Sequence, residues 1–175
     1  SHEFTTGIAG NYTVSYVAGT LTMKTAEQAI TVTANSNSQT YNGEALVDNG
    51  YSLTAGSLLE GDRLVVTVVG SATNVADTET GNNKITEVKV MHGDEDVTAN
   101  YKVTTVDGTL TITPATVTIT AKSEEFTYDG NTHSNAGYDV DGLVGNDAIE
   151  AVVEGSITYP SQSPVANEVK SHEFT

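Results

Sequence analysis

The chain has no cysteine and no tryptophan among its 175 residues, and only three prolines. Without cysteine, neither disulfides nor thiolate metal sites can hold the fold together, so its stability must come from packing and hydrogen bonds. No apolar run approaches the roughly 20 residues that a membrane-spanning helix needs, and no secretory signal pattern is present. We therefore expect no membrane insertion.

Basic residues are scarce as well. Seven Lys and Arg stand against 23 Asp and Glu, which gives a formal net charge of −16. Such a surface repels phosphate backbones and anionic membranes, and it keeps an exposed chain soluble. Nucleic-acid partners are therefore not expected.

Threonine and valine dominate what is present, with 28 and 21 copies. β-Branched residues favour a half-buried pleated surface over a helix. Ile30, Val32 and Ala34 alternate with threonines, and the same alternation recurs over 117–121. This period of two is typical of strands with one buried face. We see no amphipathic helix of ten or more residues, so the sequence predicts an all-β protein with little or no helix.

Short glycine-containing turns separate the predicted strands. Asn42-Gly43, Asp129-Gly130, Asp107-Gly108 and Ala18-Gly19 are the clearest of them. Glycine and asparagine tolerate the positive φ that tight turns demand. We expect short strands that are separated by tight turns.

The chain repeats itself at two levels. The stretch 30–43 (ITVTANSNSQTYNG) aligns without gaps on 117–130 (VTITAKSEEFTYDG), and 11–23 (NYTVSYVAGTLTM) aligns on 100–112 (NYKVTTVDGTLTI). The pentapeptide SHEFT occurs at both 1–5 and 171–175. A fixed order of matching fragments is the signature of tandem structural units. We interpret the chain as one period of a longer repeat, which holds two sister modules.

Three parts follow from this alignment. Residues 1–23, the N-terminal segment, carry the last strands of a module. Residues 24–113, the first module, form a complete unit, and residues 114–175, the second module, form the first part of its sister. Only Pro114, Ala115 and Thr116 separate the last strand of the first module from the first strand of the second. Proline restricts its own φ and the residue before it, so a stiff joint and a rod are expected.

The ordered fragments TYNG or TYDG, GY, EGD or GND, GS, NY and GTLTI recur in the two modules. In this order they resemble the MBG-type (YDG-containing) tandem repeats of bacterial cell-surface adhesins. The resemblance implies small β modules of β-grasp-like or immunoglobulin-like character in extracellular, cell-wall-attached proteins. It implies a stalk or spacer that projects a binding domain from the cell, with no catalysis and no cofactor.

Residues for chemistry are sparse. The four histidines show no metal-ligand spacing, and no nucleophile elbow, phosphate loop or dinucleotide fingerprint is present. We therefore do not expect an enzyme. The densest acidic cluster, Gly93 to Asp96, makes Asp94 and Asp96 weak candidates for a calcium site, although it lacks the spaced carboxylates of a calcium loop. A solvated acidic turn is the favoured interpretation.

Aromatic residues distinguish a stalk from the alternative function, a glycan- or mucin-binding module. Six of the eight tyrosines form repeat-equivalent pairs, namely Tyr12 with Tyr101, Tyr41 with Tyr128, and Tyr51 with Tyr138. Positions shared by diverging modules indicate a common core, so we expect Tyr41, Tyr51, Tyr101, Tyr128 and Tyr138 to be largely buried. Tyr16 and Tyr159 have no counterpart and are the candidate ligand-binding residues.

The N-terminal segment carries the strands that the second module lacks. Only six residues lead from Met23 into the first module, and they span at most about 20 Å. A chain of this kind cannot easily complete its own second module. We expect head-to-tail self-association, or the equivalent junction in a continuous tandem array.

Overall fold

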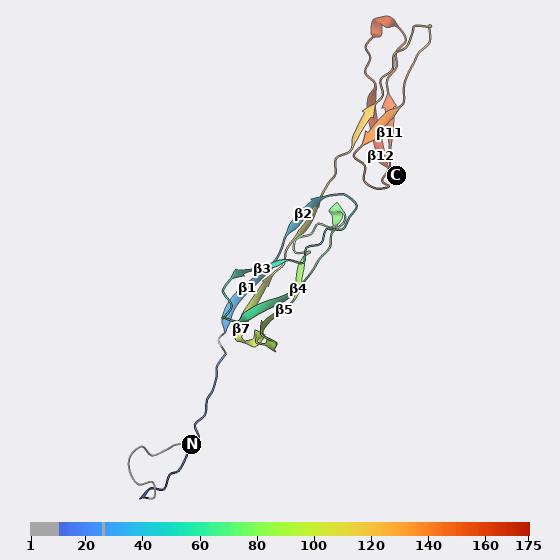
Figure 1. Ribbon diagram of the computed structural model, residues 1–175. Helices are drawn as coiled ribbons and strands as arrows, with labels where there is room; N and C mark the ends of the chain where they lie inside the picture. The colour runs from blue at the N-terminus through green and yellow to red at the C-terminus, as the bar shows by residue number, and fades with distance from the viewer. Residues whose placement is uncertain (1–10, 26) are drawn as a thin grey trace.

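The computed structural model describes residues 11–25 and 27–175. Strands dominate, and the helical structure in the described residues consists of short 3-10 turns. The all-β prediction is confirmed (Figure 1). The strands are β1 (Gln28–Ala34), β2 (Asn37–Thr40), β3 (Tyr51–Ala55), β4 (Asp62–Val69), β5 (Lys84–His92), β6 (Glu95–Asp96), β7 (Tyr101–Val106), β8 (Leu110–Thr113), β9 (Thr118–Ala121), β10 (Tyr138–Asp141), β11 (Ile149–Glu154) and β12 (Glu168–Phe174).

The first module contains three small sheets. In one, β1 lies between an antiparallel β3 and a parallel β7. In another, β4 pairs with β5 and β5 with β6, both antiparallel. The third is the parallel pair of β2 and β8. The first strands of the module are thus joined to its last two, which closes the unit.

Two apolar clusters fill the first module. Ile30, Val32, Val90 and Tyr101 form one, and Leu46, Ala72, Leu110 and Ile112 form the other, with Tyr41 packed against it. Burial of each large aliphatic side chain contributes roughly 1.5–3 kcal/mol. The buried alternate positions of β1 confirm the period-two prediction for that strand.

Gly43 and Gly130 have φ of +80° and +85°, as their turn sequences predict. Gly108 does not adopt a positive φ, so the expectation of a positive-φ turn is wrong there. Glycine is required at this position because the backbone of Asn35 lies close to it. A Cβ atom at Gly108 would lie 2.0 Å from the carbonyl oxygen of Asn35.

The second module repeats the first with fewer strands. β9 pairs with β10, and β11 with β12, both antiparallel. The β11–β12 ladder has a register shift between Val152 and Val153, and the β4–β5 ladder has one at the matching place, between Thr67 and Val68. β12 therefore corresponds to β5, and residues 171–174 of the C-terminal SHEFT lie in it. Within the described residues no strand stands where β7 and β8 stand in the first module.

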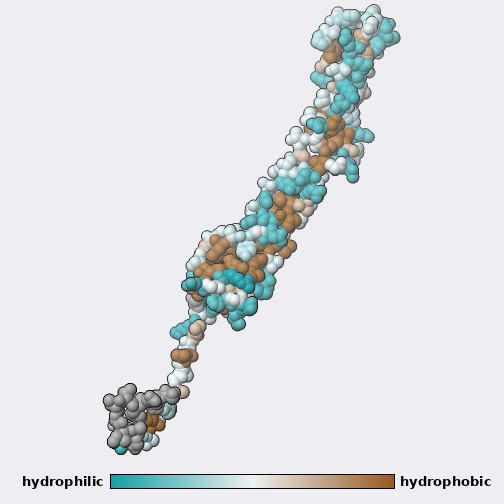
Figure 2. Space-filling model, in the orientation of Figure 1, coloured by the Kyte–Doolittle hydropathy of each residue, from teal (hydrophilic) through white to brown (hydrophobic). Residues whose placement is uncertain are grey.

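The described part of the N-terminal segment forms no strand, and Leu21 and Met23 are fully exposed. In Figure 1 it leaves the start of β1 and lies at the opposite end of the molecule from β11 and β12. Figure 2 shows apolar residues on the narrow stretch that leads to the first module. Among the described residues, no helix has the length and apolar character to cross a membrane.

Tyrosine burial follows the prediction in part. Tyr101 is buried, and Tyr41 and Tyr138 are half-buried. Tyr51 is 37% exposed, whereas Tyr128 is 58% exposed, so the prediction is wrong for Tyr128. Tyr128 differs from its counterpart Tyr41 because the cluster that Tyr41 covers includes residues of β8, which has no counterpart in the described second module.

Candidate functional site

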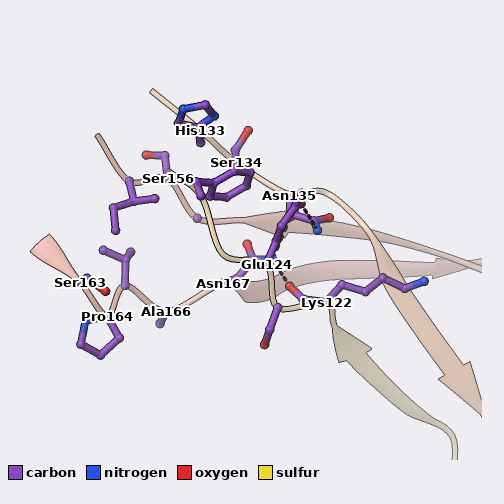
Figure 3. A pocket seen from close by; sticks show the side chains of 15 residues that line it. Lys122, Glu124, His133, Ser134, Asn135, Ser156, Ser163, Pro164, Ala166 and Asn167 are labelled. Carbon is purple, nitrogen blue, oxygen red and sulfur yellow. Dashed lines mark hydrogen bonds between the residues drawn. The ribbon is translucent and has the colours of Figure 1, made fainter. Parts of the chain in front are cut away.

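The candidate site is a groove of about 390 Å³ on the second module, called the second-module groove below. Four segments line it: 122–124 with Phe126, 133–135, 155–157 and 163–167. Figure 3 shows Lys122, Glu124 and Asn135 around Asn167, with Ser163 and Pro164 across the opening from Ser134. The bridge from His133 to Ile157 crosses the module as the bridge from Leu46 to Ala72 does in the first. The groove thus occupies the place that β8 fills in the first module.

One asparagine side chain ties together two of the segments that line the groove. Asn167 Nδ2 donates to the carbonyl oxygens of Lys122 and Asn135, both at 2.8 Å. In the first module the fully buried Asn83 makes the same pair of bonds, to the carbonyl oxygens of Asn35 and Asp48, at 2.9 and 2.8 Å. Both modules therefore fix the same loops with the same side chain.

Two hydroxyl groups stand on the groove wall. Ser123 aligns with Ser36, whose Oγ accepts a hydrogen bond from the N–H of Thr109 at 2.9 Å. Ser163 ends a 3-10 turn (Pro160–Gln162) as Thr78 ends the matching turn (Val75–Asp77).

In the first module Thr78 Oγ1 accepts a hydrogen bond from the N–H of Ile112 at 2.9 Å. Ser36 and Thr78 therefore hold β8 and the residue before it in place. Their counterparts Ser123 and Ser163 line the second-module groove.

The floor of the groove is aromatic. Phe126 stacks on the His133 ring with centroids 4.7 Å apart, and His133 Nε2 lies 2.9 Å from Asp129 Oδ1. Hydrogen bonds from Asn131, first from its side chain and then from its N–H, hold the pKa of Asp129 well below its ordinary value, and His133 adds to the effect. This arrangement positions the rings and supplies no nucleophile.

The other histidines do not converge on the groove. His92 pairs with Asp62 at 2.7 Å, and His172 lies edge-on to Phe174 in β12. His2 lies outside the described residues. Each described histidine thus has a local structural contact.

The acidic candidates Asp94 and Asp96 lie at the β5–β6 hairpin, with Asp94 in its turn. Asp96 Oδ1 accepts hydrogen bonds from the hydroxyl and the N–H of Thr98, and these bonds lower the pKa of Asp96. In the part of the chain that the structure describes, no three His, Cys, Asp or Glu side chains come close enough together to hold a metal ion. Asp94 and Asp96 therefore have no third ligand beside them.

The aromatic candidates lie apart. Tyr16 belongs to the N-terminal segment and Tyr159 to the second module, and these two parts lie at opposite ends of the molecule (Figure 1). Tyr159 is 54% exposed, and its ring lies 6.4 Å from that of Tyr128, tilted by 32°. The structure thus pairs Tyr159 with a repeat tyrosine and not with Tyr16.

Sequence reasoning missed the groove residues Ser123, Ser163 and Asn167. The alignment breaks in this loop, where TYPSQSPVANEV replaces ATNVADTETGNNKI. Both loop sequences contain an asparagine near their end, Asn83 in the first and Asn167 in the second. This shared residue was the signal that could have found the site. No protein-family model, no curated protein and no solved structure matches the chain.

Proposed function

We propose that this chain is a non-catalytic structural repeat of a bacterial cell-surface adhesin, extracellular and attached to the cell wall, which projects a binding domain from the cell. One observation carries the proposal: two diverged sequences build matching β ladders in succession, down to the register shift and the asparagine that bonds two loop carbonyl groups. Selection for the packing of the module, and not for a binding or catalytic site, explains why the strands are retained while the loops differ.

The joint between the modules supports a spacer role. Tyr41 of the first module and Asp147 of the second line one small cavity at the joint. The negative charge of Asp147, followed by burial, raises the pKa of Tyr41 above its usual value. Pro114, Val117 and Phe174 line the same small cavity as these two residues. Side-chain contacts and a restricted backbone both oppose bending.

Small-angle scattering of the dilute, monomeric chain tests the stiffness of this rod. We expect one narrow distribution of intermodule angles. The double variant Pro114→Gly with Ala115→Gly should broaden it, and Tyr41→Phe should broaden it less. A wide distribution for the unaltered chain would contradict the spacer proposal.

The surface location needs a separate experiment. Brief protease treatment of intact cells that make the chain should release peptides from residues 28–175, while a cytoplasmic marker stays intact. Release only after lysis would contradict an extracellular location.

A second candidate function is glycan or mucin binding. The neighbouring, half-exposed rings of Tyr128 and Tyr159 favour it, because such rings can serve as stacking platforms for sugars. A glycan array would test it, with Tyr159→Ala against Tyr51→Ala as the control. Specific binding lost only in Tyr159→Ala would support this function over the spacer.

A further inference from the structure

The first module shows what fills the place of the second-module groove. There Leu110 and Ile112 of β8 are buried against Leu46 and Ala72. The strand is held by parallel pairing with β2, in the register Asn37 opposite Leu110 through Thr40 opposite Thr113. Without β8, this half of the module would have no core.

The N-terminal segment has the sequence of β7 and β8. In the alignment, Leu21 and Met23 take the positions of Leu110 and Ile112, and Gly19 takes that of Gly108. The matched residues differ in burial, since Leu110 is 0% exposed and Leu21 is 103% exposed. A sequence that forms core strands in the first module thus leaves Leu21 and Met23 fully exposed in the N-terminal segment.

The groove offers the matching partners. Residues 124–127 form no strand, whereas their counterpart β2 pairs with β8. In the first module, β8 and the residues before it are held by Ser36, Thr78 and Asn83. The matching positions in the second module are Ser123, Ser163 and Asn167. When residues 21–24 are paired with residues 124–127 in the register of β8 with β2, Glu124 lies opposite Leu21 and Thr127 opposite Lys24.

Charge favours the same pairing. The chain carries a net charge of −16, but Lys24 is the one charged residue between 11 and 25. In the transferred register Lys24 would lie near Glu125 and Asp129. The segment is therefore a nearly neutral, slightly basic strand that meets an acidic module.

The segment cannot reach the groove of its own chain. Residues 24–27 separate Met23 from the start of β1 and span at most about 14 Å. In Figure 1 the segment extends from the start of β1, and the whole first module lies between it and the second. Among the residues of this sequence, the matching strands are therefore those of a second copy.

We propose that residues 12–24 of one chain bind to the second module of another copy of this chain. Residues 21–24 form a strand in the second-module groove, as β8 does beside β2, and residues 12–17 form a strand beside β9, as β7 does beside β1. The contact is heterologous, so it propagates into rows of chains unless it closes into a ring. The proposal does not depend on the spacer function, because a glycan-binding chain would assemble by the same strands.

Sedimentation velocity over a range of concentrations tests the proposal with a matched pair of variants. Leu21→Asn should weaken self-association at least tenfold. Val17→Asn is the control, because Val17 is 94% exposed in the free segment and its counterpart Val106 is still 45% exposed in the folded module. Both changes lie in exposed positions, so neither should alter the melting temperature of the dilute chain.

Gly19→Ala provides a second variant that leaves side-chain polarity unchanged. A Cβ at Gly19 meets nothing within 4 Å in the free chain, whereas one at Gly108 meets the Asn35 carbonyl oxygen. Gly19→Ala should therefore also abolish assembly without any effect on the dilute monomer. A synthetic peptide of residues 11–25 should compete with assembly, and the same peptide with Leu21→Asn should not.

Hydrogen exchange locates the contact. The amides of residues 124–127 should become protected as concentration rises in the unaltered chain and in Val17→Asn, but not in Leu21→Asn. A chain that stays monomeric up to millimolar concentration overturns the proposal. So do assembly that survives Leu21→Asn and Gly19→Ala, and protection that does not depend on concentration.

Discussion

The Tyr101 hydroxyl donates a hydrogen bond to Asp62 Oδ2 at 2.5 Å and accepts one from the N–H of Leu59 at 3.0 Å. The first residue of β7 is thereby tied to the first residue of β4, in a separate sheet. His92 of β5 contacts the other carboxylate oxygen of Asp62. One buried hydroxyl thus joins the two larger sheets of the first module.

Tyr101→Phe should lower the free energy of unfolding of the first module by about 1–3 kcal/mol, because a buried N–H and a carboxylate lose their partner. Urea unfolding measures the change. Tyr51→Phe is the control, since the Tyr51 hydroxyl makes a long, exposed bond of 3.4 Å to the Leu64 carbonyl oxygen, and it should change stability by less than about 0.5 kcal/mol. Equal effects of the two changes would contradict the role of Tyr101.

Acid should destabilise the first module through Asp62. The bond from Tyr101, and after it the contact with His92, lower the pKa of Asp62 below its ordinary value of 3.8. A carboxyl whose pKa is lower in the folded state contributes stability above the unfolded pKa, and this stability is lost as the pH falls through the folded value. We therefore expect the free energy of unfolding to decrease as the pH falls below about 4.

Asp62→Asn should be less stable than the unaltered chain at pH 7, and its stability should fall less between pH 5 and pH 2.5. Part of the decrease should remain, because the pKa values of Asp77, Asp96, Asp129 and Glu168 are also lowered. Urea unfolding at several pH values measures both variants. An identical pH dependence would show that Asp62 does not contribute.

The sequence predicted the all-β class, the positive φ of Gly43 and Gly130, and the burial of Tyr101, because these depend on local pattern and on positions shared by both modules. It failed for Tyr128, whose environment depends on strands elsewhere in the chain. It also failed for Asn167, because a side chain that bonds two distant carbonyl groups leaves no periodic pattern. Local chemistry was readable from the sequence, whereas the partners of long-range contacts required the structure.

Gly108→Ala should destabilise the first module by at least about 2 kcal/mol, because the new methyl group would clash with the backbone between β1 and β2. The bridge between Gly108 and Asn83 would have to open to relieve the clash. Thermal unfolding measures the loss. Gly93→Ala is the control, because Gly93 lies in a turn with positive φ and open space around it. A larger loss of stability for Gly93→Ala than for Gly108→Ala would contradict the crowding at Gly108.

Leu110→Ala should cost about 2–5 kcal/mol, the range for truncation of a fully buried leucine. Leu21→Ala, at the matching position of the N-terminal segment, should leave the unfolding of the dilute chain unchanged because that side chain is exposed. Urea unfolding at micromolar concentration compares the two. A measurable loss for Leu21→Ala in the monomer would mean that the segment already packs within its own chain.

Asn83→Ala should destabilise the first module by about 2–5 kcal/mol, since the carbonyl groups of Asn35 and Asp48 would both lose their donor in a buried site. Asn167→Ala removes the corresponding bonds to Lys122 and Asn135 and should loosen the second module alone. Hydrogen exchange resolved by segment separates the effects. If Asn83→Ala accelerated exchange equally over residues 28–113 and 117–175, the two modules would unfold as one unit, and each asparagine could not be the local tie that its bonds indicate.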